Sequence, residues 1–281
     1  MIIPAYNEAE AIGQTITELQ QTLSAIKCES EILVVDDGSI DSTPATASLC
    51  GVRVIRHPRN AGYGRALLTG IDVATYDNIV IVDADTTYPI EYLPELLALY
   101  GQGFDMVVGA RQGRHYKGSF IKQILRAIFR FLAEFTCGRS IPDINSGFRV
   151  FRRGPVLAER SSLSPGFSFT TTITLLFMLK NLFVAYLPIP YRGRVGKSKV
   201  RLVSDGLRSL QIIVTAIAQF NPLKLFLLLF LTSWTGILIL AVLSWALAWL
   251  GPGFWLMLAV GWGVGMVISA LAILSLVLLR T

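Results

Sequence analysis

The stretch IVIVDADTTYP, residues 79–89, joins an apolar run to two aspartates, Asp83 and Asp85, with one alanine between them. The apolar run predicts a buried strand, and residues two apart in a strand point to the same side. Two carboxylates about 4 Å apart repel by roughly 4 kcal/mol at an effective dielectric of 20, and a divalent cation removes that repulsion. A D-x-D pair also occurs in ordinary solvated turns, so the motif alone leaves a metal site and a turn both open.

Strands and helices alternate on either side of this stretch, over residues 1–155. Apolar runs predict five strands, at residues 1–7, 31–39, 52–58, 78–85 and 105–111. Periodicity and helix-start signals predict helices within residues 8–26, 41–50, 62–74 and 90–100, the second with Thr43 as its N-cap and Pro44 after it. This alternation indicates an α/β fold with a mostly parallel sheet covered on both faces, in which ligands bind at the carboxyl ends of the strands.

Acidic residues follow two of these predicted strands, since Asp36 and Asp37 occupy the same kind of strand end as Asp83 and Asp85. The first apolar run, residues 1–3, is short for a core strand, which leaves open whether the chain starts upstream. The three cysteines have no metal-ligand spacing and indicate reduced thiols. The two histidines, His57 and His115, show no catalytic partner in the sequence, and we expect both at the surface or in loops.

The carboxyl-terminal part of the chain has the composition of membrane spans. No Asp, Glu, Lys or Arg occurs from Leu225 to Leu279. We predict a domain over residues 1–200, a juxtamembrane amphipathic helix over 201–223, and two transmembrane helices, 224–250 and 254–279, that form a hairpin. Lys224 and Arg280 flank the hairpin at one end, which predicts a multi-pass protein of the cytoplasmic membrane with its domain in the cytoplasm.

The net charge of +6 comes with basic residues that gather near the predicted spans, which favours anionic headgroups or phosphates over nucleic acid as partners. Residues 120–135 alternate bases with aromatic and aliphatic residues. This segment fits a helix at the membrane interface or a helix of the domain core equally well.

Seven motifs in order resemble a known family: IPAYNE (3–8), VVDDGSIDST (34–43), RNAGYGRAL (59–67), DAD (83–85), DINSGFRVFRR (143–153), FSFTTTITL (167–175) and RVGKSK (194–199). Together they resemble the family 2 glycosyltransferases with the GT-A nucleotide-sugar fold. Within that family they are similar to the polyprenyl-phosphate glycosyltransferases, the group of dolichyl-phosphate mannose synthase and undecaprenyl-phosphate glucosyltransferases. The resemblance implies inverting transfer of a sugar from a nucleotide diphosphate sugar to a polyprenyl phosphate at the cytoplasmic leaflet.

The resemblance also implies a donor site. Asp83 is expected close to the sugar nucleotide and Asp85 at a Mg²⁺ or Mn²⁺ ion, with both carboxylates in the metal site. A relative has a glutamine as a further metal ligand where this chain has Thr87, which leaves the third protein ligand open. The remaining residues implied for donor binding are Pro4, Tyr6, Glu8, Asp36, Asp37, Asn60 and Gly62. From the sequence alone, Gly62 and Gly64 fit a close approach to a ligand and an ordinary turn about equally.

On the acceptor side, a lipid phosphate is already anionic at neutral pH and needs cationic or hydrogen-bonding groups more than a general base. The candidates are Ser146, Arg149, Arg194, Ser198 and Lys199. Asp143 fits a base or, as we favour, a residue that holds its loop and orients an arginine. Related enzymes often have an arginine where this chain has Pro142, and Arg126, Arg130 or Arg139 are the candidates to replace it.

Two other functions remain open from the sequence. A processive polysaccharide synthase of the same fold would use a sugar hydroxyl as acceptor, but such enzymes usually carry a Q-x-x-R-W motif, and no Arg-Trp pair occurs here. A non-catalytic membrane subunit would be expected to have lost one of the two aspartates. The sequence separates neither UDP from GDP donors nor one hexose from another, and it leaves a homo-oligomer open.

Overall fold

The computed structural model describes residues 1–26, 28–113, 120–193, 202–247, 254, 258–267 and 270. The chain divides into two compact units, Met1–Leu210 and Gln211–Thr281. Three predicted acceptor residues, Arg194, Ser198 and Lys199, lie outside the described residues, as does His115.

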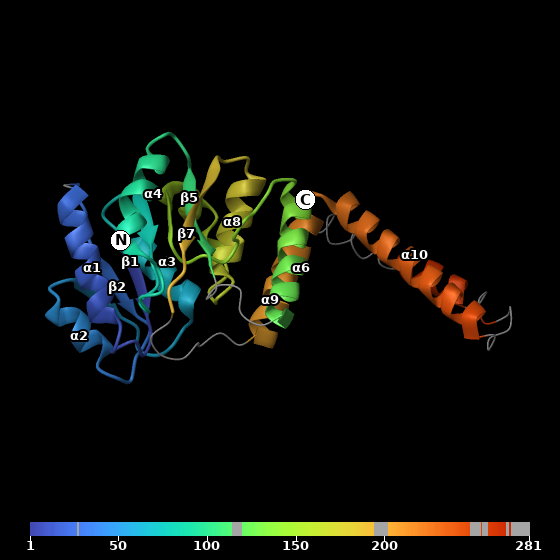
Figure 1. The fold of residues 1–281 in the computed structure, drawn as a ribbon, viewed down its shortest axis with the longest axis horizontal. Helices are drawn as coiled ribbons and strands as arrows, with labels where there is room; N and C mark the ends of the chain where they lie inside the picture. Colours follow the sequence, from blue (N-terminus) through green and yellow to red (C-terminus); the bar gives the residue numbers. More distant parts are fainter. Residues whose placement is uncertain are drawn as a thin grey trace. The chain divides into compact units, whose positions relative to one another are not determined.

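The first unit is built around a seven-stranded sheet with the strand order β3-β2-β1-β4-β6-β5-β7 (Figure 1). The strands are β1 (Ile2–Ala5), β2 (Leu33–Asp36), β3 (Arg53–Arg56), β4 (Asn78–Ile81), β5 (Met106–Gln112), β6 (Arg149–Arg152) and β7 (Val184–Pro190). The neighbours of β6, which are β4 and β5, both run antiparallel to it, whereas the other strand pairs are parallel. The predicted α/β fold with a mostly parallel sheet is therefore confirmed.

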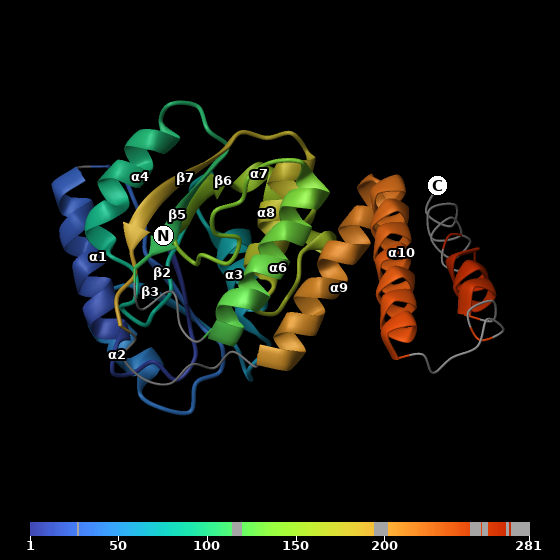
Figure 2. The same ribbon diagram turned by 45° about the vertical axis from the view of Figure 1, so that its right-hand side comes forward.

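Helices cover both faces of the sheet because successive strand residues are apolar on both sides. Ile3 and Val34 face a core with α1 (Ile12–Ile26), α2 (Thr43–Leu49) and α4 (Leu93–Tyr100). Ile2 and Val35 face a second core with α3 (Tyr63–Val73), α7 (Arg153–Ala158) and α8 (Phe169–Leu179). Figure 2 shows α1 and α4 on one side of the sheet and α8 on the other.

The predicted elements of residues 1–111 all occur, with small changes at their ends. The N-cap of α2 is Ser42, so the prediction of Thr43 at that position is wrong, and Pro44 lies at the second helical position. A 3₁₀ turn, η1 (Ile90–Tyr92), precedes α4, and a second one, η2 (Arg160–Ser162), follows α7. The amphipathic segment predicted at 120–135 is α6 (Phe120–Cys137).

Helix α9 (Leu202–Phe220) corresponds to the predicted juxtamembrane helix, and α10 (Pro222–Leu247) corresponds to the first predicted span. Within α10, Pro222–Ile239 is long and apolar enough to cross a membrane, and it is the one such helix in the part of the chain that the structure describes. Most of the second predicted span, 254–279, lies outside the described residues, so the two-helix hairpin and the multi-pass topology are not supported.

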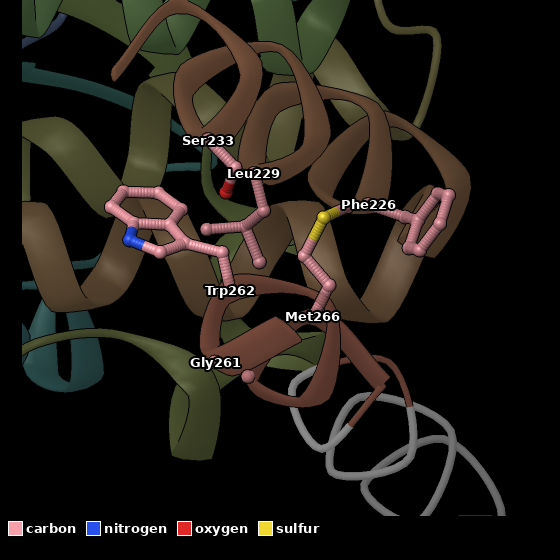
Figure 3. A pocket seen from close by; sticks show the side chains of 7 residues that line it. Phe226, Leu229, Ser233, Gly261, Trp262 and Met266 are labelled. Atoms are coloured by element: carbon pink, nitrogen blue, oxygen red, sulfur yellow. The ribbon is translucent and has the colours of Figure 1, made fainter. Parts of the chain in front are cut away.

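In the second unit, a described helical segment at 258–267 lies beside α10. Between them is an apolar cavity of about 300 Å³ lined by Phe226, Leu229, Ser233, Gly261, Trp262, Gly265 and Met266 (Figure 3). Gly236 makes room for Trp262, because an ideal Cβ there would lie 3.3 Å from the indole ring. The glycines thus allow a large aromatic side chain to pack against the neighbouring helix.

Candidate active site

The candidate site lies at the edge of the sheet where β1, β2 and β4 end. Because β6 is antiparallel to β4, with Arg149 opposite Ile81, the loop that precedes β6 meets the same edge. Strand β5 also ends there, since Val108 lies opposite Arg149. Two chain segments more than 50 residues apart in sequence, 83–87 and 141–148, are thereby brought to one side of the sheet.

Asp83 and Asp85 follow β4 directly and each accepts hydrogen bonds from its surroundings. Tyr63 Oη donates to Asp83 Oδ1 at 2.8 Å. Asp85 is 3% exposed, and its Oδ1 accepts from the Thr87 backbone N–H at 3.2 Å and from the Thr87 hydroxyl at 2.5 Å. Thr86 adopts a left-handed φ of 59°, which is rare for a β-branched residue. The strand therefore ends in a strained turn, a feature that tends to accompany functional sites.

The carboxylate oxygens of Asp83 and Asp85 are suitable ligands for a hard divalent cation. An ideal Cβ at Gly147 would lie 2.5 Å from both carboxylate oxygens of Asp83, so only glycine leaves room for that carboxylate. Thr87 donates its hydroxyl to Asp85, which places it as a support for the carboxylate. Among the described residues, no group of three His, Cys, Asp or Glu side chains is placed to hold a metal. A Mg²⁺ or Mn²⁺ ion here would take two carboxylates and fill its shell with phosphate oxygens and water.

Strand β1 and the segment after it carry three residues predicted to contact the nucleoside. Pro4 is buried within the strand, whereas Tyr6 and Glu8 are half-buried beyond its end. Asn7 between them has a left-handed φ of 51°, and its backbone N–H donates to Ser39 Oγ at 2.9 Å. The loops after β1 and β2 are thus tied together, with Tyr6 and Glu8 at the open edge and Pro4 inside the sheet.

Asp36 is fully buried at the end of β2. Its Oδ1 accepts from the Ser39 backbone N–H at 3.1 Å. Its Oδ2 has no hydrogen bond but forms an ion pair with Arg56 Nε at 3.2 Å. A buried polar atom left without a hydrogen bond costs about 1–3 kcal/mol, and the neighbouring Arg56 charge offsets part of that cost.

Asp37 has a different environment from the one that we predicted. Its Oδ1 is 2.7 Å from His57 Nδ1 and accepts from the Ala61 N–H at 2.9 Å, while Oδ2 accepts from the Gly62 N–H at 2.8 Å. His57 Nε2 lies 3.0 Å from Thr69 Oγ1. Asp37 therefore holds the loop before α3, and its predicted contact with the nucleoside stays a prediction. His57 lies in the loop after β3, as predicted, but its side chain is largely buried within this network.

Gly62 and Gly64 serve close packing between two backbone segments. Gly62 has a φ of 107°, and an ideal Cβ there would lie 2.8 Å from the Pro165 carbonyl oxygen. An ideal Cβ at Gly64 would overlap the Ser164 carbonyl oxygen. The sequence left open approach to a ligand and an ordinary turn; the structure shows a third role, close packing against residues 164–166. Asn60 is exposed on the loop just before them.

Asp143 forms a buried ion pair with an arginine that the sequence did not single out. Arg111 Nε donates to Asp143 Oδ2 at 2.7 Å, and a terminal nitrogen donates to Oδ1 at 2.9 Å. Burial alone would raise the pKa of Asp143, but the Arg111 charge and the hydrogen bonds from Arg111 and Asn145 hold it below its ordinary value. Asp143 is therefore ionised in this structure, where it stabilises its own loop and orients the Arg111 side chain.

Ser146 and Arg149, both predicted to contact phosphate, are 0% exposed. Ser146 Oγ donates to the Gly109 carbonyl at 2.6 Å. The Arg149 guanidinium donates to the carbonyls of Ile144 and Ser146 and to Thr174 Oγ1, and burial lowers its pKa. Both side chains are thus bonded inside the protein, because Arg149 begins β6 between two other strands and donates to carbonyls of the preceding loop. Direct phosphate contact by either residue stays a prediction.

Three other arginines surround a cavity of about 230 Å³ between α6 and the 141–145 loop. We call it the arginine cavity; its lining is Arg111, Gln123, Arg126, Ala127, Phe129, Arg130, Ile141, Pro142, Asp143, Ile144 and Asn145. Arg126 and Arg130 thus face the position of Pro142. Arg139 instead donates to the Leu182 carbonyl and to Asn181 Oδ1, so it is not part of the cavity.

Sequence reasoning missed Arg111 and Tyr63, which contact the two ends of the candidate site. Arg111 lies within β5, next to the end of that strand at Gln112, and the strand-end rule that selected Asp83 would have selected it as well. Tyr63 lies in the GYG stretch that was read only for its glycines. The chain offered no local signal that its hydroxyl would reach Asp83, 20 residues away.

The chain belongs to glycosyl transferase family 2, whose family model matches residues 1–157. It is 31% identical over 210 residues to a dolichyl-phosphate hexose transferase of Haloferax volcanii, covering 73% of this chain and 88% of the relative. It is 30% identical over 256 residues to the low-salt glycan biosynthesis hexosyltransferase Agl6 of the same organism, covering 89% of this chain but only 59% of that relative. The protein is a glycosyltransferase, and these relatives are consistent with the polyprenyl-phosphate group.

Solved structures support the same fold. A glucosyl-3-phosphoglycerate synthase from Mycobacterium tuberculosis, crystallised with Mn²⁺, UDP-glucose and phosphoglyceric acid, superposes with a TM-score of 0.59 at 24% identity. The alignment covers 77% of each chain. At this identity the likeness establishes the GT-A-like architecture of the domain.

Proposed function

We propose that this glycosyltransferase moves a hexose, with inversion, from a nucleotide diphosphate sugar to a polyprenyl phosphate at the cytoplasmic face of the plasma membrane. The observation that carries the proposal is that a carboxylate pair and an arginine-lined cavity lie at one edge of the same sheet. The dolichyl-phosphate hexose transferase similarity supports the lipid acceptor. The Mn²⁺ and UDP-glucose in the structural relative support the metal and the class of donor.

The donor side consists of Asp83, Asp85 and the segments after β1 and β2. Asp83 and Asp85 would hold Mg²⁺ or Mn²⁺, which when bound neutralises charge on the departing nucleotide diphosphate. In this proposal Tyr6, Glu8 and Asp36 contact the nucleoside, which the half-buried Tyr6 and Glu8 just beyond β1 support.

The acceptor side consists of the arginine cavity. A phosphate oxygen of the lipid forms the new bond to the anomeric carbon as the bond to the nucleotide diphosphate breaks, so no general base is required. Arg126 and Arg130 position this phosphate in our proposal, and Asp143 orients Arg111 toward it. Arg194, Ser198 and Lys199 are proposed to add further phosphate contacts.

Contact with the bilayer is supported by two features of the described chain. Helix α10 contains a segment long and apolar enough to span it. Helix α6 exposes Ile124, Ile128 and Phe131, which are 45%, 50% and 57% exposed, on the same helix as Arg126 and Arg130. Apolar side chains next to arginines are typical of helices that lie at a membrane interface.

The test is sugar transfer by the full chain in detergent, with Mn²⁺ or Mg²⁺ and a polyprenyl phosphate. Labelled UDP-glucose, UDP-N-acetylglucosamine and GDP-mannose are supplied separately, and label is counted in the organic phase. Asp85→Ala should abolish the lipid-linked label. Asp77→Asn, which alters an exposed carboxylate near the other end of β4, should retain it. Label that requires a glycan hydroxyl instead of the lipid phosphate would overturn the proposed acceptor.

A further inference from the structure

Tyr63 is held in place by several independent contacts at the first turn of α3. The turn is pressed onto residues 164–166, where Arg65 N–H donates to the Pro165 carbonyl at 2.8 Å. The Tyr63 ring stacks on Phe167, with centroids 5.7 Å apart and planes 12° apart. Its hydroxyl ends on Asp83 Oδ1 at 2.8 Å. The backbone and the ring thus fix the position of a single donor aimed at one carboxylate oxygen.

The opposite side of Asp83 is restricted as well. The Gly147 backbone approaches both carboxylate oxygens so closely that no side chain fits there. The Gly147 N–H donates to Tyr88 Oη at 2.6 Å, which fixes this backbone segment in turn. Asp83 therefore lies between a tyrosine donor and a glycine backbone, each held by its own contacts.

We propose that Tyr63 is a positioning residue that holds the Asp83 carboxylate in the orientation in which it meets the nucleotide sugar and its cation. This inference rests on the proposed donor chemistry but not on the proposed lipid acceptor. A hydrogen bond to one oxygen limits rotation of the carboxylate and so also fixes the direction of the second oxygen. The carboxylate then loses less conformational entropy when the ligand binds. The Phe167 ring acts through Tyr63, because it restricts the ring that carries the hydroxyl.

The test compares Tyr63→Phe with Tyr100→Phe in the full chain purified in detergent. Tyr100→Phe is a matched control, since its hydroxyl also donates to a side chain of β4, Asn78 Oδ1 at 2.7 Å. Mn²⁺ binding is measured by electron paramagnetic resonance with saturating UDP and, separately, GDP. We expect Tyr63→Phe to raise the Mn²⁺ dissociation constant about tenfold, with the melting temperature unchanged, and Tyr100→Phe to leave Mn²⁺ binding unaltered.

A double-mutant cycle separates positioning from general packing. Phe167→Leu should weaken Mn²⁺ binding about threefold in the parent protein and have little further effect in Tyr63→Phe. Mn²⁺ binding by Tyr63→Phe that equals that of the parent would overturn the inference, as would a Phe167→Leu effect of equal size in both backgrounds. If the parent chain binds no Mn²⁺ with either nucleotide, the proposed donor chemistry itself fails, and this inference with it.

Discussion

On the proposed donor side, Asp83 and Asp85 follow a buried strand directly, and the residues that make them stand out are adjacent in the sequence. On the proposed acceptor side, the arginines around the cavity come from β5 and from α6, and the loop they face precedes β6. Ser146 of that loop and Arg149 at the start of β6, both predicted to contact phosphate, are fully buried. At a strand end, the site residues follow the strand in sequence. At the loop before β6, the side chains around the cavity come from other elements that pack against that loop.

The largest effect is expected on the donor side. Asp85→Ala removes a proposed metal ligand whose carboxylate is almost fully buried. A bound cation contributes several kcal/mol of charge stabilisation, so we expect transfer to fall about 10³-fold. Steady-state rates over a range of Mn²⁺ concentrations test this. Activity within tenfold of the parent at saturating Mn²⁺ would mean that Asp85 does not hold the ion.

The acceptor loop should depend on Asp143 for stability. Asp143→Asn leaves the largely buried Arg111 without its ion pair, and we expect a loss of about 3 kcal/mol at pH 7. Urea unfolding measures it. Glu159→Gln, which breaks a solvent-exposed pair with Lys180, is the control and should change the unfolding free energy much less. A similar loss from both variants would contradict a special role for the buried pair.

The pH dependence of this pair has a definite sign. The pKa of Asp143 is lower in the folded state than its ordinary value, so the folded state binds fewer protons than the unfolded state in the acid range. Its stabilisation is fully present above the unfolded pKa of about 3.9 and is lost as the pH falls through the folded pKa. The stability difference between the parent and Asp143→Asn should therefore shrink only below about pH 4. A difference that disappears near pH 6 would contradict this.

Strands β1 to β5 were predictable because they are largely apolar runs that alternate with helices. Strands β6 and β7 were not. Strand β6 reads RVFR and has a buried arginine at its start, and β7 contains Pro188 and Pro190, which are tolerated because β7 is an edge strand. Helix α8 begins with a run of threonines, which have low helix propensity. Thr172 and Thr174 hydroxyls donate to carbonyls four residues earlier, so their polarity is absorbed within the helix.

The same contrast explains the candidate site. Asp36, Asp83 and Asp85 follow from strand ends, whereas the role of Arg149 depends on its neighbours in the sheet. From the sequence Arg149 was a candidate for phosphate contact, but it lies opposite Ile81 and Val108 in the sheet and is fully buried. Non-local strand pairing of this kind leaves no periodic signal in a short segment.

Arg149 should therefore matter for stability more than for substrate affinity. Arg149→Met leaves the carbonyls of Ile144 and Ser146 without their donor, and we expect a loss of about 2 kcal/mol of unfolding free energy. Lysine carries the charge but lacks the planar fork, so Arg149→Lys should recover only part of it. Chemical denaturation provides the measurement. A variant as stable as the parent, with a raised KM for the lipid phosphate, would instead indicate that Arg149 contacts the phosphate, as the sequence predicted.

The smallest effect is expected for Arg126 and Arg130, and it tests whether the donor and acceptor sides are separate. Each is one of several cations around the arginine cavity, and Arg130 is exposed, so the loss of one charge is partly offset by the others and by solvent. We expect Arg126→Gln or Arg130→Gln to raise the KM for polyprenyl phosphate about tenfold while leaving the KM for the nucleotide sugar unchanged. Arg53→Gln, an exposed arginine on the edge strand β3, is the matched control. If the KM of the donor rose equally, the cavity would belong to the donor side, and the separation of the site into a carboxylate side and an arginine side would be wrong.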